Sequence, residues 1–214
     1  MMNRRRLLGF GAGLTGAVVT APISRFGRAA DRLLTPGQAR GPFYPRQFPI
    51  DKDFDLTTVA GSSGVAFGQI LTVSGQVTDL AGAAQPGVLI EIWQVNGYGR
   101  YHHEDDPSDK PIDPNFQGYG MVLSDGEGRY SFRTVKPIAY PGRAPHVHFA
   151  LTPKMGRSLV TQMYVAGAPE NERDFLLSGI RDKDRRNSLM APLEPVRGGG
   201  ELQGRFDIVL PKVS

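Results

Sequence analysis

Apolar and polar residues alternate over several short stretches of this chain, and that alternation predicts β-strands. Leu71, Val73, Gly75 and Val77 are separated by polar residues, which is the period of a strand with one buried face. Residues 88–95 form a denser apolar run with β-branched residues and predict a more fully buried strand. Further strands are predicted at residues 129–132, 146–151, 159–165 and 206–210.

Turn signals between these stretches favour an all-β fold. Residues 125–128, with the sequence Asp-Gly-Glu-Gly, are typical of a hairpin turn. One short helix is predicted at residues 170–177, with Pro169 at its start. Two long polar segments are predicted to be functional loops, residues 96–121 and 182–203. The pattern therefore predicts an antiparallel β-sandwich with long functional loops and little helix.

The N-terminal segment differs from the rest in charge. Residues 1–30 contain five arginines and no acidic residue, so the net charge of +4 comes from this segment. Arg4 and Arg5 precede an apolar, glycine-rich run over residues 7–19, which resembles a twin-arginine export signal. The run is too short and too glycine-rich for a stable membrane span. We expect a periplasmic or secreted protein; the alternative is a disordered basic tail.

The remaining chain is predicted to hold one β-sandwich domain behind an extended arm. Residues 31–68 show no sustained period and are predicted to form the arm, and residues 69–214 the β-sandwich domain. The basic balance gives no reason to expect nucleic acid as a partner. The sequence does not set the oligomeric state and allows a homo-oligomer. Because there is no cysteine, any metal must be held by histidine, carboxylate or tyrosine.

The strongest chemical signal is a pair of histidines on one predicted strand. His146 and His148 alternate with Val147 and Phe149, so both imidazoles face one way and the apolar residues face the other. Two converging neutral imidazoles suit a metal ion, although a lone pair of this kind is more often structural.

The chain has only four histidines, in two clusters, and a tyrosine adjoins each cluster. Tyr101 precedes His102 and His103, and Tyr140 precedes the predicted strand with the other two. Because acidic residues follow His102 and His103, we expect these two to lie in a solvated loop. A copper or zinc site that uses one of them is an alternative.

Several longer motifs then occur in a fixed order. They are LIEIWQ (89–94), GRY (99–101), DPNF (113–116), GRYSFRTVKP (128–137), YP (140–141), HVHF (146–149) and GRFDIVL (204–210). Together they resemble the intradiol ring-cleavage dioxygenases, most of all the β subunit of protocatechuate 3,4-dioxygenase. The resemblance implies cleavage of a catechol-type aromatic diol by dioxygen between its hydroxyl-bearing carbons, giving a cis,cis-muconate-type diacid.

The resemblance also implies roles for individual residues. Tyr101, Tyr140, His146 and His148 would hold a non-haem Fe(III) ion, and Tyr140 would leave it when the diol binds. Arg143 would stabilise negative charge on the substrate. The resemblance further implies that Gln162 supports the site. Trp93 is expected either to line the pocket or to pack in the core.

The sequence departs from the protocatechuate enzymes in one segment, and it permits a rival interpretation. Only five residues separate Tyr140 from His146, and Gly142 stands where those enzymes have a tryptophan. Residues 31–68 are also too few for the helical dimerisation domain of catechol 1,2-dioxygenases. The turn motifs alone also resemble transthyretin-like β-sandwich modules, so a non-catalytic binding module is the alternative function.

Overall fold

Two β-sheets form the part of the chain that the structure describes, residues 32–212 of a computed structural model. The predicted export signal over residues 1–30 lies outside the described residues. Within residues 32–212, no helix has the length and apolar character needed to cross a membrane.

The first sheet is built around its longest strand, β1. Its members are β1 (Ile70–Asp79), β4 (Arg129–Val135), β8 (Leu193–Pro195), β9 (Leu202–Arg205) and β10 (Ile208–Leu210). β4 pairs antiparallel with β1, whereas β9 and β10 pair parallel with it in succession. At the break between β9 and β10, the Phe206 amide donates to the Ser74 carbonyl at 2.9 Å. Gly75 is needed there, because a Cβ would lie 2.0 Å from the Phe206 carbonyl oxygen.

The second sheet places the histidine strand at its centre. Its order is β3 (Tyr119–Leu123), β2 (Leu89–Trp93), β5 (His146–Thr152), β6 (Leu159–Val165) and β7 (Met190–Ala191). β5 pairs antiparallel with both β2 and β6, and β7 pairs parallel with β6. The register sets Trp93 and Gln162 on either side of His148, and Tyr164 beside His146.

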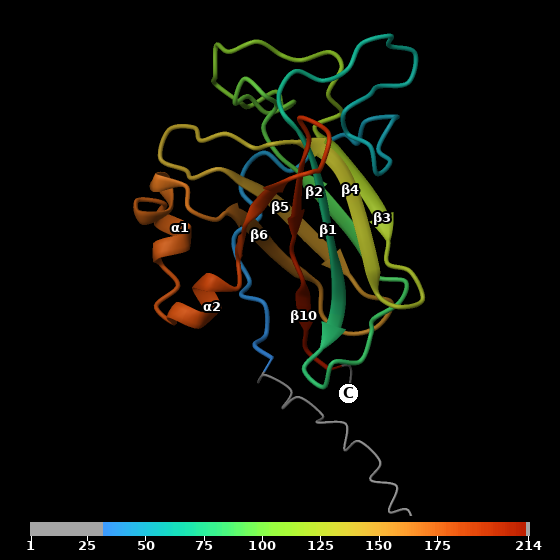
Figure 1. Cartoon of the computed structure of the whole chain (residues 1–214), viewed down its shortest axis with the longest axis vertical. Coiled ribbons are helices and arrows are strands. Elements are labelled where there is room, and N and C mark those ends of the chain that lie inside the picture. The colour runs from blue at the N-terminus through green and yellow to red at the C-terminus, as the bar shows by residue number, and fades with distance from the viewer. Residues whose placement is uncertain (1–31, 213–214) are drawn as a thin grey trace, which may run out of the picture. The chain divides into compact units, whose positions relative to one another are not determined.

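The core lies between the sheets, with β1 and β4 in front of β5 and β6 in Figure 1. Alternation along β5 decides which residues enter it. Val147, Phe149 and Leu151 have no exposed area and belong to this core. The side chains of His146 and His148 therefore project from the opposite face of the sheet, as the alternation predicted.

The all-β sandwich is confirmed, but its sheets are mixed rather than purely antiparallel. The short helices are η1 (Pro169–Glu172), α1 (Phe175–Ser178) and α2 (Lys183–Asn187). The helix predicted at residues 170–177 starts at Pro169 as expected, but it breaks at Asp174, whose extended backbone begins α1. The segment predicted as a loop at residues 182–203 holds α2, β7, β8 and the start of β9.

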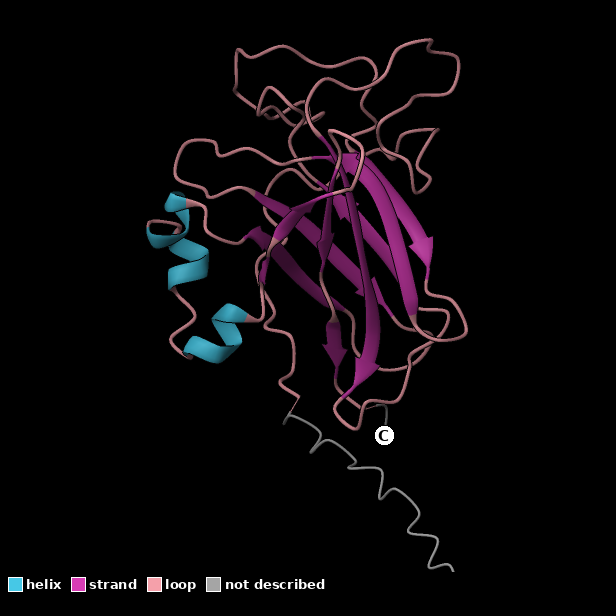
Figure 2. Ribbon diagram, in the orientation of Figure 1, coloured by secondary structure: helices cyan, strands magenta, loops and turns pink. Residues whose placement is uncertain are grey.

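The long loops gather at one end of the sheets (Figure 2). Residues 32–68 form no helix or extended strand, and their start runs along β6. The Gln38 amide donates to the Val160 carbonyl at 2.8 Å, and the Gln162 side chain donates to the Ala39 carbonyl at 3.1 Å. Further along, a Cβ on Gly41 would lie 3.4 Å from the His148 ring, so the arm covers the face from which the histidines project.

Candidate metal centre and active site

Two imidazoles on β5 provide the rigid half of the site. His146 and His148 are each 2% exposed, and their Nε2 atoms lie 3.2 Å apart. His146 Nδ1 lies 2.6 Å from the Ala144 carbonyl oxygen, so Nδ1 carries the proton and Nε2 presents its lone pair. The His148 ring stacks on Trp93 at 4.7 Å with 9° between the planes. Trp93 thus supports an imidazole as well as packing in a cluster on this face.

A tight loop after β2 brings Tyr101 to the histidines. The Asn96 side chain accepts from the amides of Tyr98 and Arg100, and Gly99 takes a positive φ of 85°. The Tyr101 amide then donates to Asp106 at 2.6 Å. These contacts fix the backbone on both sides of Tyr101, which is 3% exposed.

Tyr140 and Arg143 are placed side by side by a four-residue turn. The Arg143 amide donates to the Tyr140 carbonyl at 2.9 Å. Pro141 takes the second position and Gly142 the third, with φ of 78°, which is the pattern of a type II β-turn. The short connection between Tyr140 and the histidine strand, noted in the sequence, is closed by this turn.

The four predicted ligands converge through their terminal atoms. The Tyr101 hydroxyl oxygen lies 3.0 Å from His148 Nε2, 3.4 Å from His146 Nε2 and 3.3 Å from the Tyr140 hydroxyl. The Tyr140 hydroxyl lies 3.4 Å from His146 Nε2. Ligand atoms about 2.0–2.1 Å from a tetrahedral ion are about 3.3–3.4 Å apart. The spacing therefore fits four atoms around one metal ion.

Burial gives the four groups defined protonation states in the absence of metal. It lowers the pKa of His146 to about 3, with the Arg143 charge adding to the effect, and holds the pKa of His148 well below its usual range. It raises the pKa of Tyr101 well above 10 and also raises the pKa of Tyr140. Both imidazoles are therefore neutral and both phenols protonated at neutral pH. A strongly Lewis-acidic ion is needed to form the phenolates.

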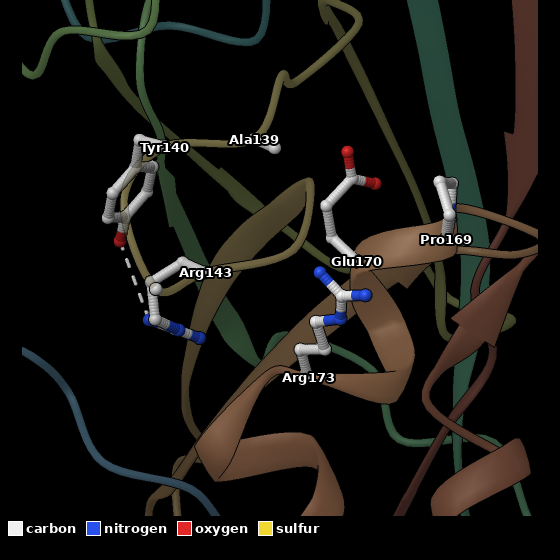
Figure 3. A pocket seen from close by; sticks show the side chains of 7 residues that line it. Ala139, Tyr140, Arg143, Pro169, Glu170 and Arg173 are labelled. Carbon is white, nitrogen blue, oxygen red and sulfur yellow. Dashed lines mark hydrogen bonds between the residues drawn. The ribbon is translucent and has the colours of Figure 1, made fainter.

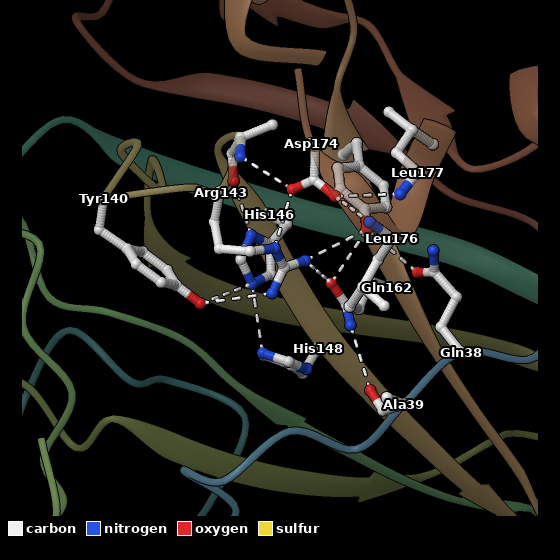
Figure 4. A network of polar contacts seen from close by, with 12 residues as sticks. Gln38, Ala39, Tyr140, Arg143, His146, His148, Gln162, Asp174, Leu176 and Leu177 are labelled. Atoms are coloured by element: carbon white, nitrogen blue, oxygen red, sulfur yellow. Dashed lines mark hydrogen bonds and ion pairs between the residues drawn. The ribbon is translucent and has the colours of Figure 1, made fainter. Parts of the chain in front are cut away.

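Arg143 forms the cationic side of the site (Figure 4). Its NH2 donates to Gln162 Oε1 and, at 3.2 Å, to the Tyr164 hydroxyl; its NH1 lies 3.4 Å from the Tyr140 hydroxyl. Its Nε pairs with Asp174 at 2.9 Å. Gln162 accepts from Arg143 on its oxygen and donates to the Ala39 carbonyl with its nitrogen. Gln162, predicted to support the site, therefore contacts Arg143 and not the four predicted ligand atoms.

Tyr140 borders two cavities. A cavity of about 510 Å³ lies on the side of Tyr101, Phe43 and Pro107. A second, of about 390 Å³, is lined by Arg143, Glu170 and other residues that Figure 3 shows around Tyr140. The first is large enough for a small aromatic molecule.

His102 and His103 are not brought to this cluster. His102 Nδ1 lies 3.2 Å from the Phe116 carbonyl oxygen, and His103 Nδ1 accepts from the Asp105 amide at 3.1 Å. Within residues 32–212 no three His, Cys, Asp or Glu side chains are grouped to hold a metal. The structure therefore gives no support to a copper or zinc site on these loop histidines.

Comparison with known proteins identifies the family. A family model described as Dioxygenase matches residues 39–212, and the chain belongs to this family of intradiol ring-cleavage dioxygenases. It is therefore an enzyme of that class, and the resemblance seen in the motifs is confirmed. The alternative of a transthyretin-like binding module is not supported.

Similar proteins include two curated enzymes. The chain is 42% identical over 168 residues to the protocatechuate 3,4-dioxygenase beta chain of Burkholderia cepacia, covering 74% of this chain and 71% of that one. It is 31% identical to the hydroxyquinol 1,2-dioxygenase of Rhodococcus opacus, covering 79% of this chain but only 61% of that enzyme.

Solved structures also match. The dioxygenase domain of a carbohydrate-binding protein fusion from Streptomyces sp. SirexAA-E is 29% identical, with a TM-score of 0.65, covering 83% of this chain and 98% of that domain. An intradiol dioxygenase from Tetranychus urticae, 20% identical with a TM-score of 0.67, covers 84% of this chain and 95% of that one and supports the fold.

The structure adds residues that the sequence did not single out. Phe43 of the arm stacks on Tyr101 at 4.6 Å, and Tyr44 contacts Trp93 edge-on at 4.9 Å. Asp174 pairs with Arg143 across 31 positions. An aspartate before an apolar run was readable as a helix cap, but its arginine partner was not.

Proposed function

We propose that this enzyme cleaves a catechol-type aromatic diol with dioxygen between the two hydroxyl-bearing carbons, giving a cis,cis-muconate-type diacid. The observation that carries the proposal is the convergence of two phenols and two neutral imidazoles on one point beside a cavity. The similar protocatechuate and hydroxyquinol dioxygenases are named for aromatic diols or triols and support this substrate class.

In this proposal Tyr101, Tyr140, His146 and His148 hold a non-haem ferric ion. Hard anionic phenolate oxygens favour Fe(III) over Fe(II). When bound, the ion supplies the Lewis acidity that keeps both phenols ionised and activates the chelated diol toward dioxygen.

The chain's own residues then divide the remaining work. Tyr140, at the edge of the donor set, accepts a proton from a diol hydroxyl as the diol takes its place. Arg143 stabilises negative charge that develops on the ring oxygens, because its NH1 already lies near the Tyr140 hydroxyl. Gln162 holds the NH2 of that arginine in place. Phe43 and Pro107 provide an apolar part of the cavity wall for the ring to contact.

The test uses iron-loaded protein and two matched pairs of histidine variants. We expect red-brown colour from tyrosinate–Fe(III) charge transfer, and consumption of dioxygen with catechols. Replacing His146 and His148 with alanine should abolish both, whereas alanine at His102 and His103 should leave both near wild type. Wild-type iron content and turnover in the first pair would refute the assignment, as would a fully iron-loaded wild type inactive on a panel of catechols.

We also propose that the enzyme is exported in folded form by the twin-arginine route, which suits a protein that acquires its metal before export. Arg4, Arg5 and the apolar run that follows support this. Lysine at both arginines should block export, and N-terminal sequencing of the exported protein should find residues 1–30 largely removed. Undiminished export of the lysine variant would contradict the proposal.

A further inference from the structure

A buried carboxylate joins the active-site arginine to the first turn of α1. The Asp174 side chain has no exposed area and that of Arg143 is 9% exposed. Asp174 Oδ2 accepts from Arg143 Nε and from the Ala144 amide, both at 2.9 Å. Its Oδ1 accepts from the amides of Leu176 and Leu177, both at 3.0 Å (Figure 4). Oδ2 therefore binds the segment that precedes β5, and Oδ1 binds the start of α1.

This carboxylate stays ionised although it is buried. Burial opposes ionisation, but the amides of Leu177 and Ala144 and the Arg143 charge outweigh it and hold the pKa of Asp174 below its ordinary value. Asp174 is therefore ionised at neutral pH and provides a negative partner for the guanidinium.

The contacts of the guanidinium determine where it points. A guanidinium is planar, so fixing two of its nitrogens fixes the third. Nε is held by Asp174, and NH2 by Gln162 and Tyr164. NH1 is left facing the Tyr140 hydroxyl. Without Asp174, the guanidinium would keep its NH2 contacts, the 3.4 Å contact of NH1 and the Phe175 ring 5.5 Å away, but it would lose its carboxylate partner and the restraint on Nε.

We propose that Asp174 is the positioning residue of Arg143, aiming NH1 at the space where the diol binds. This inference rests on the proposed function, in which Arg143 stabilises negative charge on the substrate. A charged group misplaced by about 1 Å costs up to about a hundredfold in rate. The segment that carries η1 and α1 thereby becomes part of the catalytic apparatus, although it supplies no ligand to the donor set.

The chain provides a matched control for the capping role of Asp174. Asp182 caps α2 in the same way, with its Oδ1 accepting from the amides of Asp184 at 3.0 Å and Arg185 at 3.1 Å. In the described part of the chain, no arginine side chain pairs with Asp182. Serine is a good helix cap but is too short to reach an arginine, so Asp→Ser at both positions separates capping from positioning.

The experiment measures steady-state kinetics of the iron-loaded full chain with catechol. We expect Asp174→Ser to lower kcat about ten- to a hundredfold. Its KM, iron content and charge-transfer band should stay near wild type. Asp182→Ser should keep wild-type kcat. Wild-type kcat in a folded Asp174→Ser variant would overturn the proposal. Where that variant does not fold, Asp174→Asn takes its place under the same criterion, since it keeps the shape and loses the charge.

A double-mutant cycle separates this inference from the function on which it rests. Because Asp174 acts through Arg143, Arg143→Ala with Asp174→Ser should turn over no more slowly than Arg143→Ala alone. If the rate losses of the two single variants multiplied in the double variant, the proposal that Asp174 acts by positioning Arg143 would be overturned. Wild-type turnover in Arg143→Ala would instead refute the proposed role of the arginine itself.

A metal-free readout completes the test. In ¹⁵N-labelled metal-free protein, we expect the Arg143 Nε–H signal to be protected from exchange in the wild type and in Asp182→Ser. The protection should be lost in Asp174→Ser. Equal protection in all three proteins would show that Asp174 does not hold the guanidinium, and would overturn the proposal.

Discussion

Tyr101 and Tyr140 occupy different places in the donor set, and phenylalanine at each position tests the difference. The Tyr101 hydroxyl lies within 3.4 Å of all three other donor atoms, and the residue is 3% exposed. The Tyr140 hydroxyl lies within this distance of Tyr101 and His146, and its ring borders both cavities. We therefore expect Tyr101 to retain the metal and Tyr140 to be the residue that a diol displaces.

The size of each effect follows from these positions. In Tyr140→Phe, the proton acceptor for the diol is lost, which typically costs about 10²–10⁴-fold in rate. In Tyr101→Phe, the metal loses its most central anionic ligand. The loss of affinity should exceed the 10–100-fold typical of removing an outer-shell partner. Losing a hydroxyl hydrogen bond costs about 1 kcal/mol, so both variants should fold.

The assay combines iron content, the visible spectrum and stopped-flow binding of catechol. Tyr140→Phe should keep iron, lose part of the charge-transfer absorption and bind catechol slowly. Tyr101→Phe should lose iron on dialysis. If both variants kept wild-type colour and iron content, the four-ligand assignment would be wrong. If their defects were interchanged, the ligand set would stand but the division of roles would not.

Three further results are expected. Because the pKa of Asp174 is held below its ordinary 3.8, its contribution to stability is present above that pH and lost as pH falls through the folded pKa. The difference in unfolding free energy between wild type and Asp174→Asn should therefore shrink below about pH 4; a constant difference would contradict this. If the free iron concentration is about a thousandfold above its Kd, removing the iron with a chelator should lower Tm by roughly 8–16 °C. An unchanged Tm would mean that the metal does not bind the folded site. Gly142→Ala should cost roughly 1–2 kcal/mol and reduce turnover by displacing Tyr140. Gly198→Ala, at a similar φ of 83° but away from the site, should cost stability without affecting turnover.

The sequence predicted the long strands because their alternation reflects burial on one side. In β1 and β5 the side chains that enter the core recur at every second position. α2 escaped notice because it buries no residue and so has no apolar period. The parallel pairing of β9 and β10 with β1 depends on contacts across more than a hundred residues, such as that of Gly75 with Phe206. Local sequence carries no signal for such pairing.

The parts of the candidate site that depend on neighbouring residues could be predicted from the sequence, and the parts that depend on distant contacts could not. Alternation placed His146 and His148 on one face, and motif resemblance added the tyrosines. The turn that joins Tyr140 to Arg143 was readable from the Pro-Gly pair. The pairing of Arg143 with Asp174 was not, because it depends on how η1 and α1 dock beside β6.

Burial acts in opposite directions on the imidazoles and the phenols of the proposed donor set, whereas the charge of Arg143 acts in the same direction on both. Burial is the larger influence on all four groups. It lowers the pKa of His146 and His148 but raises the pKa of Tyr101 and Tyr140. The positive charge of Arg143 lowers the pKa of all four and so favours the unprotonated form in each. The imidazoles are therefore ready to bind a cation, whereas the phenols need one of high charge to lose their protons. A divalent ion bound mainly through the imidazoles would leave the phenols protonated, and this protonation argument supports the proposal of a trivalent ion.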